Sequence, residues 1–294
     1  MKKFTKVMLI IAGICACIGV ICMVTAFAMG LTTSSFLQMA REGKFAFDMT
    51  DMSLFKVNKT EIKTEQNLQI VGGEDEDINS NSSEEWTFFL DEECDAIDID
   101  FGAGIFQICY DDVDKIQIQH KNIRNLDTKV KNGVLKISTE QEVGIENVQE
   151  RSLVLVLPNG KQFKEIDLEI AAAKAEIDGL LADEIDITIG AGQANISNTT
   201  TKHMEIEVGA GEANLSNLTV ENFDIEVGMG QVIAEVNGVR DEYICDIDCA
   251  MGSVVVDHHS YHGTHTEHHG KHHSTTKRII VECGMGNVEI AFQE

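Results

Sequence analysis

A pair of small residues, separated by one position, recurs along this 294-residue sequence from residue 102 onward. Four consecutive pairs follow one another at steps of 19 residues, and steps of 22 and 34 residues lead to the last two. The pairs are Gly102/Gly104, Ala171/Ala173, Gly190/Gly192, Gly209/Gly211, Gly228/Gly230, Ala250/Gly252 and Gly284/Gly286. A fixed period of this length predicts a repeat architecture, in which each unit buries its apolar face against its neighbours.

Apolar residues keep the same positions around every pair. With the first small residue as position zero, positions −5, −3, −1, +4 and +6 are apolar in all seven copies. A period of two is typical of strands. Because the apolar parity changes from odd to even at the pair, the strand must bulge or turn a corner there. Glycine, which has no Cβ, accepts the dihedral angles and the crowding of such a bend.

One coil cannot bury its own inner face, whereas coils stacked about 4.8 Å apart cover one another. The repeat therefore predicts an all-β fold, a parallel β-solenoid with about 19 residues per coil and seven or more coils. A β-sandwich is the alternative, although a sandwich does not require the same phase slip in every repeat. The alternating runs "KIQIQ", "GVLKIST" and "SLVLVLP" predict further strands, which we interpret as a first pair of coils with longer turns.

The N-terminus has the pattern of a membrane anchor. Lys2, Lys3 and Lys6 precede an uncharged apolar segment at 7–31, and about 20 apolar residues suffice to span a bilayer. The expected order is a cytoplasmic basic tail (1–6), a transmembrane signal-anchor (7–31), an acidic stalk or linker (32–90) and a solenoid ectodomain (91–294) with a His-rich loop (257–276). A cleaved signal peptide is the alternative, since "AFA" at 26–28 resembles a cleavage site. Both alternatives place the bulk of the chain outside the cytoplasm.

The net charge of −26 argues against nucleic acid as a partner, because no basic surface is present to displace phosphate counterions. Outward positions −4 and −2 of the repeat are acidic in twelve of fourteen places. Like charges about 5 Å apart cost on the order of 0.8 kcal/mol per pair in water, so we expect a strip that collects divalent cations or a basic partner, such as a cationic peptide or an envelope protein. A solubilising face is the alternative. The candidate residues are Asp167, Glu169, Asp186, Glu205, Glu207, Asp224, Glu226, Asp246 and Asp248.

Histidines crowd the segment between the last two copies. Imidazoles spaced three or four residues apart can bind zinc, nickel or copper, and they gain charge near pH 6. We expect a projecting loop that offers a divalent-metal site, with no cofactor required. An incidental polar insertion is the alternative. The candidate ligands are His258, His259, His262, His265, His268, His269, His272 and His273.

Two further pairs of residues share a position in the repeat. Cys249 and Cys283 occupy the same inward column of adjacent coils, where they form either a disulfide or two buried thiols. Asn195 and Asn198 recur 19 residues later as Asn214 and Asn217, and we expect them to cap turns as stacked ladders.

The segments "LPNGKQFKEIDLEI", "IDITIGAGQANISN", "MEIEVGAGEANLSNL", "FDIEVGMGQV" and "VECGMGNVEIAF" resemble the bacterial putative-adhesin family of β-strand-repeat domains, a domain of unknown function. The resemblance covers roughly residues 92–292. It implies a right-handed solenoid behind one membrane segment, at the cell surface or in the envelope, and it implies no catalytic residues. Some members of the family are associated with envelope-stress sensing.

These observations together predict a non-enzymatic, membrane-anchored surface protein that binds or senses, in the manner of an adhesin or an envelope-stress sensor. A structural spacer or a metal-binding protein that uses the histidine loop is the second reading. A carbohydrate-active solenoid enzyme is the third. Such an enzyme needs a focused pair of carboxylates in a groove, whereas the acidic residues here form continuous columns.

Overall fold

The computed structural model describes residues 68–71, 85–123, 126–139, 151–268 and 277–293, all of which belong to one compact unit, Glu65–Glu294. The basic tail expected at 1–6 and the anchor expected at 7–31 lie outside the described residues. Within the described ranges, no helix has the length and apolar character needed to cross a membrane.

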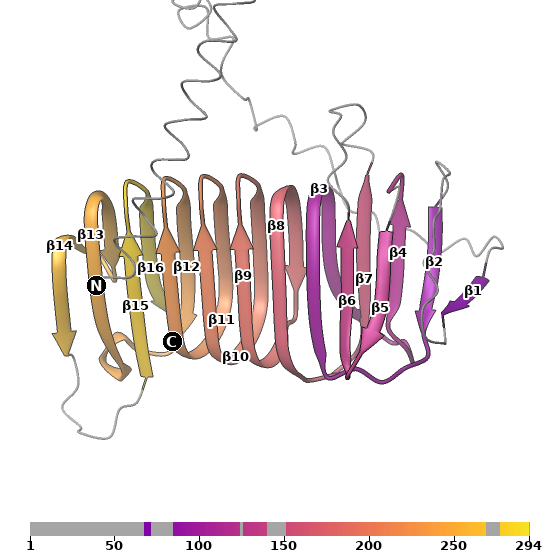
Figure 1. The fold of residues 1–294 in the computed structure, drawn as a ribbon. Coiled ribbons are helices and arrows are strands. Elements are labelled where there is room, and N and C mark those ends of the chain that lie inside the picture. The colour runs from indigo at the N-terminus through magenta and orange to yellow at the C-terminus, as the bar shows by residue number, and fades with distance from the viewer. Residues whose placement is uncertain (1–67, 72–84, 124–125, 140–150, 269–276, 294) are drawn as a thin grey trace, which may run out of the picture. The chain divides into compact units, whose positions relative to one another are not determined.

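The described residues form one all-β sheet of 16 strands, coiled upon itself (Figure 1). In chain order the elements are β1 (Leu68–Val71), β2 (Glu85–Leu90), β3 (Ala96–Asp111), β4 (Gln117–Lys121), β5 (Leu126–Lys131), β6 (Val134–Thr139), β7 (Ser152–Pro158), β8 (Phe163–Asp178), β9 (Leu181–Ile189), β10 (Gln193–Val208), β11 (Glu212–Val227), β12 (Gln231–Asn237), the 3₁₀ turn η3 (Arg240–Glu242), β13 (Tyr243–Val256), β14 (His259–His268), β15 (Lys277–Cys283) and β16 (Asn287–Gln293).

In the central coils, each residue pairs with the residue 19 positions further along the chain, as the repeat predicts. Gln193 of β10 pairs in parallel with Glu212 of β11, and Leu181 of β9 pairs with Thr200 of β10. Each coil has one arm before the glycine pair, a corner at the pair, and a second arm after it. The predicted solenoid-like coiling of a parallel sheet is confirmed.

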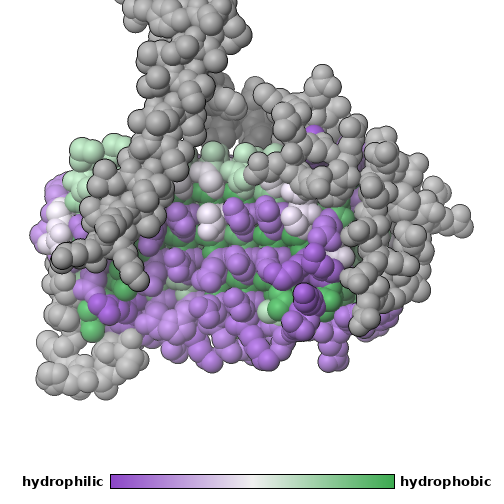
Figure 2. Space-filling view, in the orientation of Figure 1, coloured by the Kyte–Doolittle hydropathy of each residue, from purple (hydrophilic) through white to green (hydrophobic). Residues whose placement is uncertain are grey.

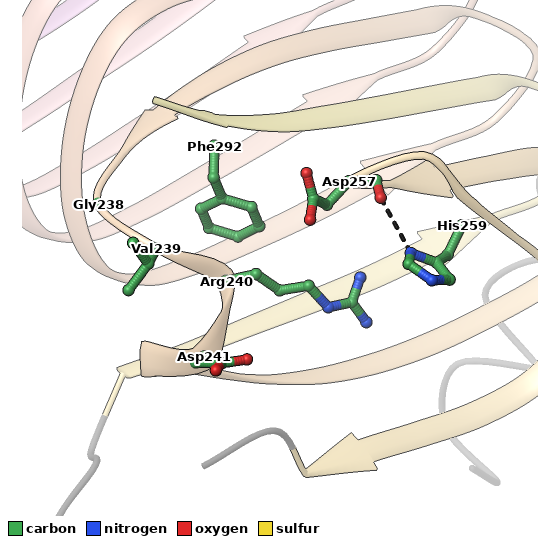
Figure 3. A pocket seen from close by; sticks show the side chains of 7 residues that line it. All are labelled: Gly238, Val239, Arg240, Asp241, Asp257, His259 and Phe292. Carbon is green, nitrogen blue, oxygen red and sulfur yellow. Dashed lines mark hydrogen bonds between the residues drawn. The ribbon is translucent and has the colours of Figure 1, made fainter. Parts of the chain in front are cut away.

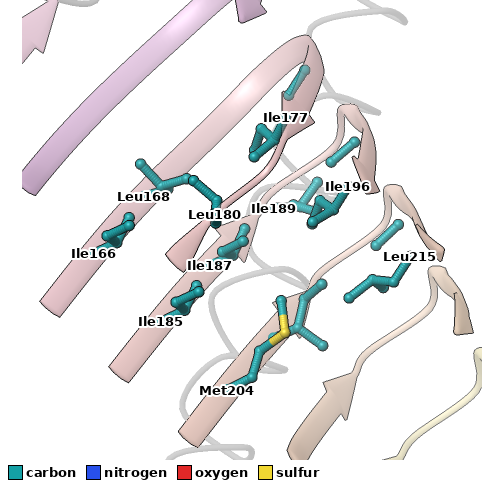
Figure 4. Packing of buried hydrophobic residues seen from close by; sticks show 14 of the residues in the cluster. Ile166, Leu168, Ile177, Leu180, Ile185, Ile187, Ile189, Ile196, Met204 and Leu215 are labelled. Atoms are coloured by element: carbon teal, nitrogen blue, oxygen red, sulfur yellow. The ribbon is translucent and has the colours of Figure 1, made fainter. Parts of the chain in front are cut away.

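The inward columns are the core. All five apolar positions of the repeat are buried in all seven copies, which confirms the alternation and the change of parity. Figure 4 shows how side chains at equivalent positions, such as Ile166, Ile185 and Met204, stack from coil to coil. Full burial of one such side chain stabilises a fold by roughly 1.5–3 kcal/mol, so the stacked columns are the principal source of stability.

The glycine pairs lie at the expected corner because neighbouring coils approach closely there. A Cβ on Gly211 would lie 2.4 Å from the carbonyl oxygen of Gly192, and one on Gly192 would lie 2.1 Å from that of Ala173. Of the paired glycines, only Gly104 has a positive φ, of 130°. Crowding between coils therefore requires glycine at these positions, and unusual dihedral angles do not. Corner amides also bond the preceding coil, as from Ala210 N to Gly190 O at 2.8 Å.

The opposite turn of each central coil depends on asparagine. Asn198 and Asn217 both have φ of 54°, a left-handed conformation that asparagine tolerates better than most residues. Asn217 donates a hydrogen bond to Asn198 at 2.6 Å, and Asn237 donates one to Asn217 at 2.7 Å. Asn214 likewise donates to Asn195 at 3.3 Å. The predicted asparagine ladders are present, and Asn198 and Asn217 lie at the turn as expected, whereas Asn195 and Asn214 lie within the arms of β10 and β11 and cap no turn.

The last coils do not stack in chain order. Strand β15 pairs with both β11 and β13, and β16 pairs with both β12 and β13. The C-terminal coil β15–β16 therefore lies between the coil that ends in β12 and the coil of β13 (Figure 1). In the 34-residue step, the chain first forms β13 and β14 and then returns to fill the space between β13 and the preceding coil. The corner Gly284/Gly286 therefore lies between the corners Gly228/Gly230 and Ala250/Gly252.

The other end of the sheet is built in a similar way. Strands β6 and β7 both pair in parallel with β3, and β8 pairs with the other side of β3. The predicted strands in "KIQIQ", "GVLKIST" and "SLVLVLP" are present as β4, β6 and β7. Strands β6 and β7 form one coil against β3 rather than the predicted pair of coils, and β4 instead pairs antiparallel with β2 and β7. Strands β1 and β2 fall within the range 32–90, which the sequence suggested to be a stalk, and β2 pairs with β4.

Candidate functional site

The acidic candidates lie in two columns on the arms that precede the corners. Asp98, Asp167, Asp186, Glu205 and Asp224 occupy consecutive coils of one column, which continues through Ile280 to Asp246. The second column contains Asp100, Glu169, Glu207, Glu226, Glu282 and Asp248, with Thr188 between Glu169 and Glu207. We call these two columns the acidic face. Figure 2 views the arms that precede the corners, where hydrophilic side chains run in rows across the strands.

Basic residues neutralise the ends of the first column. Lys136 of β6 forms an ion pair with Asp98 at one end, and Arg278 of β15 forms one with Asp246 at the other. Ile280 stands between Asp224 and Asp246. In the described part of the chain, no lysine or arginine forms an ion pair with the central members of this column, Asp167, Asp186 and Glu205. The negative charge of the face is therefore concentrated in its middle.

The pKa values of several carboxylates in the middle of the acidic face are raised. Partial burial, reinforced by Glu184, Glu205, Asp167 and Glu165, raises the pKa of Asp186 to about 6. Burial and the neighbouring carboxylates also raise the pKa of Glu205 and of Glu226. Ionisation of these central carboxylates is therefore energetically less favourable in the folded protein than in water.

Such a face can attract cations, but its geometry does not enclose one. Outward side chains on neighbouring coils stand side by side at roughly 5 Å, whereas a calcium site takes six to eight oxygens around one point. Among the described residues, no group of three histidine, cysteine, aspartate or glutamate side chains is arranged to hold a metal ion. The acidic face is therefore suited to diffuse attraction of cations or to a basic partner that pairs with several carboxylates.

The histidine segment differs in part from the expected loop. Residues from His259 to His268 form β14, an antiparallel strand that pairs with β13. His259 Nδ1 lies 2.9 Å from the carbonyl oxygen of Asp257, and His265 Nε2 lies 2.7 Å from that of His262. His258 is exposed in the turn before the strand. The predicted ligands His269, His272 and His273, and the side chain of His268, lie outside the described residues.

Cys249 and Cys283 are paired in register on β13 and β15, as their shared column predicted. Both are buried free thiols, the second of the two alternatives. Burial, together with the neighbouring Cys249, raises the pKa of Cys283 to about 11. A thiol that is so reluctant to ionise is a poor nucleophile, so this pair serves as packing.

A pocket of about 430 Å³ lies beside η3, the turn after β13 and the end of β16, and is lined by Arg240, Asp257, His259 and Phe292 among others (Figure 3). Arg240 Nη1 donates to the carbonyl oxygen of Val256 at 3.0 Å, and Nη2 donates to the Tyr261 hydroxyl at 2.7 Å. The buried guanidinium therefore fastens η3 to the final hairpin. At least two of its donors are thus engaged within the fold, and Asp241, Asp257 and His259 also line the pocket.

Two features escaped the sequence analysis. His120 is buried and stacks on Phe88, and burial lowers its pKa to about 4. The sequence could have predicted this burial, because His120 continues the alternation of inward positions that Ile116 and Ile118 begin. The second feature is a row of exposed methionines, Met229, Met251 and Met285, each standing between the two small residues of its pair.

No family model matches this chain, and no curated protein matches it. Solved structures show a limited likeness. The chain is 18% identical to a protein described as a "putative cell adhesion protein" from Clostridium sporogenes, with a TM-score of 0.43, covering 71% of this chain and 99% of that one. A "putative adhesin" from Bacteroides fragilis is 14% identical, with a TM-score of 0.36, over 71% of this chain and 98% of that one. A "putative adhesin" from Parabacteroides merdae is 10% identical, with a TM-score of 0.28, over 74% of this chain and 99% of that one. These names describe those three proteins only.

Proposed function

We propose that this chain is a non-enzymatic binding protein of the bacterial envelope, adhesin-like or stress-sensing, whose acidic face engages cations or a basic partner. In this proposal the segment 7–31 anchors the chain as a single-pass membrane protein, and the coiled sheet lies outside the cytoplasm. The resemblance of the repeat to adhesin-family sequences supplies the class of protein, and the acidic face supplies the means of binding.

One observation carries the proposal: the pKa of Asp186 is raised to about 6 in the middle of a column of carboxylates. A bound cation offsets the repulsion among these groups, so binding releases free energy that the unbound face stores. Because the repulsion is spread over several carboxylates, a polycation that pairs with several of them should bind with a more favourable free energy than a single ion. A cationic peptide is therefore the favoured class of partner.

Binding of a lysine-rich peptide to the full-length chain tests the proposal. We expect saturable binding whose affinity falls steeply between low and physiological salt, because exposed charges are screened over about 10 Å at 0.1 M. A variant that neutralises the face, Asp167→Asn with Asp186→Asn and Glu205→Gln, should bind at least tenfold more weakly at low salt.

The matched control removes the same three charges from arms that follow the corners, in Glu212→Gln with Glu235→Gln and Glu289→Gln. This control should lose no more than about twofold, since only the net charge changes. Equal losses in the two variants would mean that the peptide responds to overall charge, and the acidic face would then have no special role.

The anchor is tested separately. Intact mass of the protein extracted from bacterial membranes distinguishes a retained segment 7–31 from a cleaved one. We expect the full mass of the 294-residue chain in the membrane fraction. A shortened chain that begins after residue 28 would instead indicate a processed signal peptide.

A further inference from the structure

Three methionines form an exposed ridge at the corner of the last coils. Met229, Met285 and Met251 expose 63%, 55% and 77% of their surface. Methionine is among the residue types most often found inside proteins, and the only other large apolar side chain exposed in the described ranges is Val239, at 37%. The equivalent positions in the preceding central coils are Ala172, Ala191 and Ala210.

The three methionines stand on consecutive coils. The amide of Met285 donates to the carbonyl oxygen of Gly228 at 2.8 Å, and the amide of Met251 donates to that of Gly284 at 2.8 Å. The spatial order is therefore Met229, Met285, Met251, with about 4.8 Å between neighbours. Insertion of the β15–β16 coil puts Met285 in the middle, although it is the last of the three in sequence.

One of the histidines continues the row. Strand β14 pairs Tyr261 with Val254 and Gly263 with Cys249, so His262 lies opposite the corner that contains Met251. His262 is exposed. His262 therefore stands three strand spacings, roughly 14 Å, from Met229, which is too far for the two side chains to bind one ion. The ridge proper consists of the three thioethers. The small residues beside each methionine are Gly228 and Gly230, Gly284 and Gly286, and Ala250 and Gly252, which leave the sulfur atoms unobstructed.

The chemistry of these groups is specific. Thioethers are soft ligands that select Cu(I), while imidazole accepts copper readily. The three rotatable bonds of each methionine allow sulfur atoms on adjacent coils to converge on one ion. We propose that Met229, Met285 and Met251 form a three-thioether binding site for Cu(I) or a similarly soft monovalent cation, with Met285 in the middle. This site is distinct from the acidic face, whose hard carboxylates suit other cations.

Methyl NMR of the full-length chain, labelled with ¹³C at the methionine methyl groups, tests the proposal with Ag(I), a soft monovalent ion that air does not oxidise. The resonances of Met229, Met251 and Met285, assigned from single leucine variants, should shift together and saturate. The buried Met204 is an internal reference, since it lies in the core at 2% exposure.

The triple variant Met229→Leu with Met251→Leu and Met285→Leu keeps an apolar ridge but has no thioether there. It also keeps all eight cysteines, which bind Ag(I) themselves, and so measures their contribution. We expect the variant to bind one Ag(I) fewer than the parent protein. His258→Asn, at the distant turn of the hairpin, should leave the methionine response unchanged.

Three unmoved methionine resonances, or equal Ag(I) uptake by the parent and the leucine variant, would overturn the proposal and leave the ridge as an apolar surface only. A shift confined to one methionine would overturn it as well, because isolated thioether contact is not a shared site.

Discussion

Replacement of Asp186 with asparagine should stabilise the protein at neutral pH, although it removes a charged residue from the surface. The side chain faces outward on β9, between Asp167 and Glu205 of the neighbouring coils. Partial burial and four nearby carboxylates raise its pKa from 3.8 to about 6. Asparagine has nearly the same shape and carries no charge, so the substitution removes repulsion with little loss of packing.

The magnitude follows from the pKa. A shift of roughly two units corresponds to about 3 kcal/mol of unfavourable interaction once the carboxyl is ionised. The group is partly exposed and solvent screens it, so we expect a gain of ~1–2 kcal/mol at pH 7. Because the folded state holds its proton more tightly than the unfolded state, the parent protein loses this stability as pH rises from about 4 to about 6. At pH 4 the gain from the substitution should therefore nearly vanish.

Urea unfolding of parent and variant at pH 7 and at pH 4 measures the effect. Asp183→Asn is the matched control on the same strand, since Asp183 pairs with Lys202 at 2.7 Å. An exposed ion pair contributes up to about 1 kcal/mol, so this control should lose slight stability or none. If Asp186→Asn failed to raise the midpoint at pH 7, or raised it equally at pH 4, repulsion within the column would not explain the raised pKa.

Other consequences of the structure can be checked in the same protein. Gly211→Ala should destabilise the fold by ~2 kcal/mol in thermal unfolding, because its Cβ would meet Gly192 O at 2.4 Å; the exposed neighbour Ala210→Ser should have little effect. The contribution of the buried His120 to stability should decline as pH falls from about 6.5 to about 4, by up to ~3 kcal/mol, because this side chain resists protonation with a pKa of about 4; since this loss opposes the gain at Asp186, His120→Phe should leave the protein relatively more stable at pH 4 than the parent, and a pH profile unchanged by the substitution would refute this cause. Zinc should bind weakly by calorimetry, and replacing the eight histidines at 258–273 with glutamine should abolish the binding; retained binding would place the metal elsewhere.

The repeat made most of the central fold predictable. Alternating apolar positions and the small-residue pair fix the two arms, the corner and the inward columns, since each depends only on local parity and stacking. The outward columns followed from the same parity, so the sequence also located Asp186, Glu205 and their neighbours. The asparagine ladders were predictable because the same residue recurs at the same step.

The order of the final coils was not predictable in this way. A 34-residue step fits a coil stacked on either side of β13, and the apolar pattern of Lys277–Cys283 is equally satisfied in both places. The position of this coil depends on which coils pack on either side of it, and such tertiary contacts cannot be read from the local sequence pattern. The methionine ridge was missed although Met229, Met251 and Met285 share one position of the repeat in its last three copies; only their order in space depends on the inserted coil. Strand β14 was also missed, since its histidines mask the alternation that Tyr261 begins.

The order of the last coils is the central structural claim, because both the end of the acidic face and the order of the three methionines in the ridge depend on it. It can be tested by cysteine pairs at exposed or half-exposed positions, cross-linked with a short bifunctional thiol reagent such as dibromobimane, with the parent chain as the blank for native thiols. Glu226 pairs in register with Glu282, and Glu282 pairs with Asp248. Efficient cross-linking in Glu226→Cys with Glu282→Cys, and little in Glu226→Cys with Asp248→Cys, is the predicted result. The reverse result would show that the coils stack in chain order and would contradict the inserted C-terminal coil.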